Sequence, residues 1–88
     1  MHWQEALKES LDWIPMEART GPAAGRKSAG WKVAVAAHLK ATTNVSNGWL
    51  AERLEMGSPI YVSKHVGLLR KGAGNGREWL EQLQKGKQ

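Results

Sequence analysis

The sequence predicts an all-α fold, a small helical bundle that contains a helix-turn-helix. Apolar residues recur at spacings of three and four along most of the chain, which is the period of helices that bury one face. Side chains that cap helices precede two of these segments, and prolines and glycines separate the others. With 88 residues the chain forms one domain at most, and its core is too small to hold both a deep substrate pocket and a crossover sheet.

The first part of the chain predicts an amphipathic helix followed by a linker. Over residues 1–14 an apolar stripe with spacings of 4, 4 and 3 consists of Trp3, Leu7, Leu11 and Ile14. Pro15 should end this helix. Residues 15–28 hold two prolines, two glycines and little apolar content, and they predict a basic linker.

Residues 29–84 are expected to form the domain, with residues 85–88 as a tail. A helix should begin near Ser28 or Gly30 and run through "WKVAVAAHLKA", with one face made of Trp31, Val35 and either His38 or Leu39. At the other end "REWLEQLQ" predicts a short helix whose inward side chains are Trp79, Leu80 and Leu83.

Between these helices, residues 46–70 predict the helix-turn-helix. In "NGWLAERLEM" the cap is either Ser46 or Asn47, and the buried side carries Leu50, Ala51 and Leu54. In "GSPIYVSKHVGLLRKG" Ser58 is the expected N-cap, Pro59 takes the first helical position, and the inward stripe is Val62, Val66 and Leu69. Ala51 allows the two helices to cross closely and Met56 fills the turn between them.

The charge distribution favours a polyanionic partner. Thirteen Lys and Arg residues against eight Asp and Glu give a net charge of +5. The basic residues gather in the linker and around residues 64–71, apart from an acidic first helix. The chain has no cysteine, which suits the cytoplasm and excludes disulfides and thiolate zinc sites. No apolar run approaches the ~18 residues of a membrane span, so no membrane partner is expected.

An enzyme is not expected. "GPAAGRKS", residues 21–28, comes within one residue of a phosphate-binding loop, but Arg26 stands where that loop needs glycine, and no strand leads into it. No nucleophile, base and oxyanion donors can be assembled. His2, His38 and His65 stand far apart, which argues against a metal site and favours surface or phosphate contacts for His38 and His65. No cofactor is expected.

The expected partner is double-stranded DNA. The second helix of the pair would turn its outer face to the major groove, where Lys64 can donate to guanine, Ser63 can serve either role and Ile60 can contact a thymine methyl. Pro59, Tyr61 and His65 belong to the same surface. Contacts to the DNA backbone are expected from Ser58, Thr43, Ser46 and Asn47. Four basic residues are also expected to bind DNA: Arg70, Lys71 and, in the linker, Arg26 and Lys27.

The segment "WKVAVAAHLKATTNVSNGWLAERLEMGSPIYVSK" resembles the carboxy-terminal region of bacterial transposases associated with repetitive extragenic palindromes, which are single-tyrosine enzymes with a histidine-pair metal site. The resemblance spans residues 26–66, and its most specific piece is "AERLxMGSPxYVS". It implies an accessory or regulatory DNA-binding domain without the catalytic one. The adjacent metal-binding histidines are absent, and Tyr61, on the presumed recognition helix, does not take the role of the catalytic tyrosine.

The turn of this pair departs from the usual pattern. Glu55 occupies a position that often holds glycine, and Gly57 adds one residue before the second helix. The base-facing positions therefore shift by ~100° if the register slips by one residue.

A protein-interaction or dimerisation module is the alternative function. The first helix could pack on the core, or it could pair through its apolar stripe with a second copy, which suits a palindromic site, or with a catalytic partner domain. Docking predicts that changes at Leu7 and Leu11 matter. Four of the five tryptophans are expected in the core, and Trp13 is the best candidate for an exposed ring.

Overall fold

The computed structural model describes residues 3–14, 19, 29–72 and 76–86. They form five helices and no strand, which confirms the all-α prediction. The helices are α1 (Trp3–Asp12), α3 (Gly30–Thr42), α4 (Asn47–Arg53), α5 (Pro59–Arg70) and α6 (Arg77–Gly86). Most of the predicted linker, with Arg26 and Lys27, lies outside the described residues. Within the described ranges, no helix has the length and apolar character needed to span a membrane.

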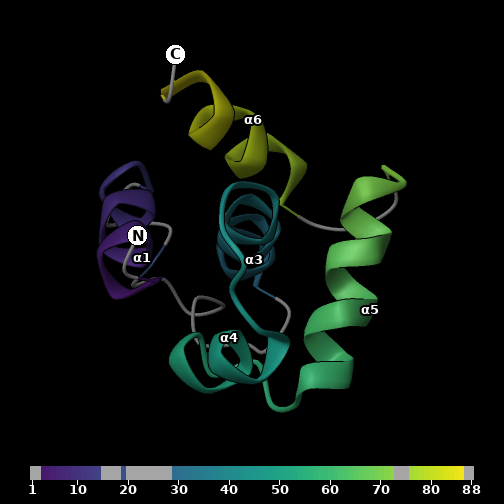
Figure 1. Ribbon diagram of the computed structural model, residues 1–88. Helices are drawn as coiled ribbons and strands as arrows, with labels where there is room; N and C mark the ends of the chain where they lie inside the picture. The colour runs from purple at the N-terminus through teal and green to yellow at the C-terminus, as the bar shows by residue number, and fades with distance from the viewer. Residues whose placement is uncertain (1–2, 15–18, 20–28, 73–75, 87–88) are drawn as a thin grey trace.

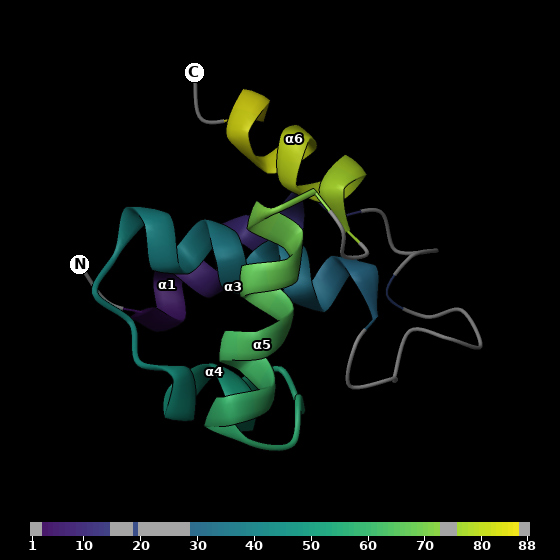
Figure 2. The ribbon, with the colours of Figure 1, turned by 90° about the vertical axis from the view of Figure 1, so that its right-hand side faces the viewer.

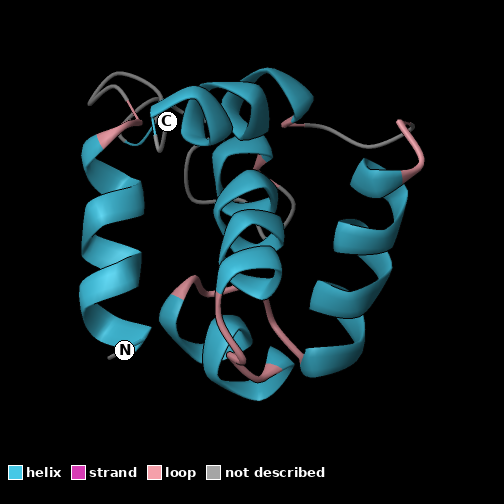
Figure 3. Cartoon of the chain, turned by 45° about the horizontal axis from the view of Figure 1, so that its top comes forward, coloured by secondary structure: helices cyan, strands magenta, loops and turns pink. Residues whose placement is uncertain are grey.

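Helix α3 lies at the centre of the bundle. Figure 1 views it nearly end-on, with α1, α4, α5 and α6 arranged around it. Helix α5 crosses α3 steeply (Figure 2), and α1 and α5 lie on opposite sides of α3 (Figure 3). The small side chains of α3, Ala34, Ala36 and Ala37, are buried and allow the neighbouring helices to approach closely.

The central position of α3 corrects one prediction. The sequence predicts a helix with one buried face, but every side chain from residue 32 to residue 39 is buried. His38 is therefore an interior residue and not a surface or phosphate contact. The reason is tertiary, because α1, α5 and α6 all pack against α3, and its residues 32–39 include only two polar side chains, Lys32 and His38.

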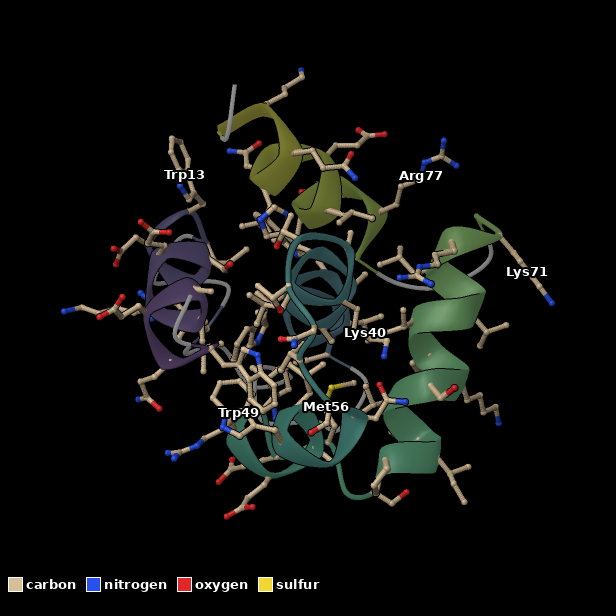
Figure 4. The ribbon with its side chains drawn as sticks, in the orientation of Figure 1. Trp13, Lys40, Trp49, Met56, Lys71 and Arg77 are labelled. Atoms are coloured by element: carbon tan, nitrogen blue, oxygen red, sulfur yellow. The ribbon has the colours of Figure 1, made fainter. Side chains whose placement is uncertain are left out.

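Helix α1 packs against α3, as the first of the two alternatives left open for it predicts. Leu7 and Ile14 of the apolar stripe are buried, as are Ala6 and Ser10. The Ser10 hydroxyl donates to the carbonyl oxygen of Ala6 at 2.9 Å, so its burial leaves no unpaired donor. Trp13, just beyond α1, points away from the molecule (Figure 4) and is 46% exposed, which confirms the expected exposed ring.

The turn between α4 and α5 is a Schellman motif with glutamate in the position that glycine usually takes. The amide of Met56 donates to the carbonyl of Ala51 at 2.9 Å, and the amide of Glu55 to that of Glu52 at 3.4 Å. Glu55 has φ +54° and Gly57 has φ +94°. Met56 follows in a fully buried position between α3 and the α4–α5 turn (Figure 4), so it fills the turn as predicted.

Glu55→Gly is expected to raise the free energy of unfolding by about 0.5–1 kcal/mol. A left-handed conformation costs a residue with a Cβ roughly 1–2 kcal/mol, and the greater unfolded-state entropy of glycine offsets part of that gain. Urea denaturation measures the change. Glu52→Gly, one turn earlier inside α4, is the control and should lower stability by about 1 kcal/mol. Equal losses in both variants would show that the Glu55 backbone is not strained.

Helices α3 and α6 meet at their N-terminal ends through two glycines, Gly30 in α3 and Gly76 just before α6. A Cβ on Gly30 would lie 3.2 Å from the amide nitrogen of Gly76, and a Cβ on Gly76 would overlap the carbonyl oxygen of Gly30. Gly76 has φ +96°. Beyond this contact Leu83 is buried, and Trp79 and Leu80 are half-buried against the core, as the sequence predicts.

Candidate nucleic-acid interface

The turn before α4 is held by hydrogen bonds within the chain. The Thr43 hydroxyl donates to the carbonyl of Leu39 at 2.7 Å and accepts from the amide of Val45 at 3.2 Å. The ammonium of Lys40, on α3, donates to the Asn47 side-chain oxygen at 2.7 Å. These bonds fix the direction in which α4 leaves α3.

Two predicted helix caps are confirmed. The Ser46 hydroxyl accepts from the amide of Trp49 at 3.1 Å, and the Ser58 hydroxyl accepts from the amide of Tyr61 at 3.2 Å. Pro59 is the first residue of α5. Three of the residues predicted to contact phosphates before α4, namely Thr43, Ser46 and Asn47, thus each make an intramolecular hydrogen bond that shapes the interface.

One side of α5 faces away from the protein. Val62, Val66 and Leu69 are buried, as predicted, and seat the helix on α3 and α4. At ~100° per residue the opposite side carries Ile60, Lys64, Gly67 and Lys71. We call these four residues the outer stripe of α5. Ile60 is 82% exposed, and Lys64 and Lys71 are also exposed.

The residues flanking the outer stripe differ in exposure. Ser63 and Arg70 are exposed on one flank. On the other flank Tyr61 and His65 are half-buried and lie against each other, with ring centroids 4.3 Å apart at an angle of 41°. The sequence predicts that Tyr61 and His65 share the outward surface with Ile60. In the structure they lie at the edge of that surface and are half-buried.

Gly67 leaves the backbone of α5 bare in the middle of the outer stripe. Its φ is not positive, and a Cβ built there would have nothing within 4 Å. Glycine inside a helix costs about 1 kcal/mol relative to alanine. Within the described part of the chain no neighbouring atom and no positive φ requires a glycine at this position.

The interface is positively charged along α5 and mixed on α4. Helix α5 and the residue after it carry Lys64, Arg70 and Lys71 and no carboxylate. Helix α4 exposes Glu52 and Arg53, and the Arg53 guanidinium lies 5.7 Å from the ring centroid of Trp49.

Helix α1 supports the first helix of the pair, a contact that sequence reasoning missed. The indole N–H of Trp3 donates to the Asn44 side-chain oxygen at 3.0 Å. The rings of Trp3 and Trp49 meet edge to face, with centroids 5.6 Å apart (Trp49 is labelled in Figure 4). The periodicity identifies both rings as apolar anchors, but residues more than 40 positions apart carry no signal of pairing in one sequence.

Sequence reasoning also missed Arg77. Arg77 and Lys71 extend from the same side of the molecule in Figure 4, Arg77 from α6 and Lys71 from the end of α5. From the sequence Arg77 is only the first residue of the last predicted helix. In the structure its side chain lies near the end of α5. Among the described residues, no three histidine or carboxylate side chains are grouped so that they could hold a metal ion.

Comparison of the chain with protein-family models, with curated proteins and with solved structures gave no match.

Proposed function

We propose that this chain binds duplex DNA sequence-specifically, with α4 and α5 acting as a helix-turn-helix, as the accessory or regulatory domain of a transposase-like system. The outer stripe of α5 carries the proposal. It presents a nearly fully exposed isoleucine and two lysines on a rigid helix that has no carboxylate. The transposase-like assignment rests on the sequence resemblance alone.

The outer stripe supplies both kinds of contact that a major groove requires. Lys64 donates hydrogen bonds to guanine acceptors, and Ile60 makes apolar contact with a thymine methyl. Ser63, beside them, serves as donor or acceptor. Removal of the exposed Ile60 side chain from water against a base would add to the affinity for DNA.

Selection of bound sequences tests the function. The purified chain is equilibrated with a pool of random duplexes at several salt concentrations, affinity is followed by fluorescence anisotropy, and the retained DNA is sequenced. Enrichment of a short motif, with affinity falling steeply as salt rises, supports a sequence reader. Salt-dependent binding without enrichment contradicts sequence specificity, and the absence of binding contradicts the whole proposal.

Gly67→Ala should stabilise the fold and weaken DNA binding. The methyl group adds helix propensity of about 0.5–1 kcal/mol but stands in the outer stripe, where we propose that DNA approaches the backbone. We expect a higher urea midpoint and an affinity for the selected duplex that is several-fold lower. Gly48→Ala is the matched control, because Gly48 is a helical glycine of α4 outside the outer stripe, and its Cβ would make only an ordinary contact, 3.9 Å from Cγ of Pro59. Gly48→Ala should leave affinity unchanged, and an equal effect of both variants would remove Gly67 from the interface.

Dimerisation through α1 is a second role that one surface favours. A groove of about 250 Å³ runs beside α1 between Gln4, Leu7, Lys8 and Leu11, and Trp13 is exposed beyond it. Leu7 is itself buried in the core, so its replacement would test folding, contrary to the expectation that it reports docking. A palindromic motif from the selection experiment would favour pairing of two copies, and a motif without symmetry would favour a monomer.

A further inference from the structure

A groove separates the C-terminal end of α5 from α6. Its volume is about 410 Å³. Leu69 and Leu80 give it an apolar lining, and the polar lining includes three cations: Arg70, Lys71 and Arg77. Two of these cations come from the end of α5 and one from the start of α6.

Arg77 closes over the end of α5. Its Nη1 atom lies 3.2 Å from the point where a Cβ on Gly72 would stand. Gly72 follows the C-cap Lys71 with φ +81°, and because it lacks a side chain the guanidinium of Arg77 lies directly over bare backbone. The fold thus places a cation from α6 beside the two cations that end α5.

The charges of the groove remain unbalanced. Glu81 is the carboxylate that lines it, with Oε1 3.5 Å from Nε of Arg77. The two side chains are 69% (Arg77) and 62% (Glu81) exposed, so this ion pair is weak and can open when a stronger anion arrives. Three cations against one carboxylate leave the groove positive.

We propose that this groove binds a phosphate of the DNA backbone at the edge of the major groove that α5 enters. The inference rests on the proposed function and extends it to a second element, α6. From Ile60 to Lys71 the outer stripe rises about 16 Å at ~1.5 Å per residue. The major groove is about 12 Å wide, so a helix laid across it reaches the flanking strand with its last turn. Arg77 then supplies a planar fork of N–H donors, which suits a phosphate.

Arg77→Gln tests the groove in the full chain. On the duplex obtained by selection, we expect an affinity that is several-fold lower and a slope of log K against log salt that is smaller by about 0.9, the value for one phosphate contact. The preferred sequence should not change, because a backbone contact carries no base information. Glu81→Gln should bind more tightly than the wild type.

Lys85→Gln is the matched control, since it removes the same charge from an exposed position of α6 outside the groove. If Arg77→Gln and Lys85→Gln change the affinity equally, or if Arg77→Gln keeps the wild-type salt slope, the groove does not bind a phosphate, and the proposed function still stands. A wild-type chain that binds no duplex overturns both. Thermal unfolding of each variant should match the wild type, because the replaced side chains are exposed.

Discussion

Replacing Gly76 by alanine is expected to lower the free energy of unfolding by about 2–4 kcal/mol. The new Cβ would overlap the carbonyl oxygen of Gly30 and lie 3.2 Å from its Cα, so the first turns of α3 and α6 would have to separate. The φ of +96° adds a conformational cost, because residues with a Cβ rarely adopt it. For 88 residues the whole stability is roughly 4–13 kcal/mol, so this one methyl group removes a large share of it.

Urea denaturation of Gly76→Ala and Gly76→Asn separates the two causes. Asparagine tolerates positive φ better than alanine, but it carries the same Cβ. If the overlap with Gly30 dominates, both variants lose stability alike; if φ dominates, asparagine recovers much of it. Gly48→Ala and Gly67→Ala control for the residue change itself and should both stabilise. A wild-type midpoint for Gly76→Ala would show that α3 and α6 are not held in contact at this point.

The helices of this fold could be predicted from the sequence because their signals are local. Ser58 and Pro59 mark the start of α5, and the spacing of Val62, Val66 and Leu69 identifies its buried side. The reason is physical: capping and amphipathic burial act within about one to two turns of the residues that cause them.

The arrangement of the helices could not be predicted in the same way. The sequence of α3 does not reveal that three other helices pack against it, and nothing near Trp3 in the chain points to Asn44 or Trp49. Such contacts depend on which apolar faces meet, and several arrangements bury the same stripes. The conformation of Glu55 could be predicted in part. The sequence shows glutamate at a turn position that often holds glycine, but only the structure shows that its φ is positive.

The exposure of side chains on α5 is predicted correctly where a side chain stands opposite the buried stripe of that helix. Ile60 and Lys64 satisfy that condition and are exposed. Tyr61 and His65 lie to one side, where a small rotation of the helix decides between exposure and burial, and they pack against each other. The role of Arg77 could not be predicted without the structure, because only the fold brings its guanidinium over Gly72 at the basic end of α5.

Lys64→Ala is expected to weaken binding to the selected duplex by about 5- to 150-fold and to relax the base preference at one position. A hydrogen-bonded contact from a basic side chain to guanine is worth about 1–3 kcal/mol of discrimination, which corresponds to that range. The fold should not change, because Lys64 is exposed and no hydrogen bond or ion pair joins it to another described residue. Competition between the selected duplex and random duplexes measures affinity and preference together.

Lys85→Ala removes the same charge from an exposed position of α6, outside the outer stripe of α5 and outside the groove between α5 and α6. If Lys64 reads a base, Lys64→Ala loses most of its preference for the selected duplex, while Lys85→Ala keeps that preference and nearly all of its affinity. If both variants lose affinity equally on selected and random duplexes, the lysines contribute only net charge. Base recognition by α5 would then have to come from Ile60 and Ser63. Lys64 would only help to position α5 on the DNA through its charge.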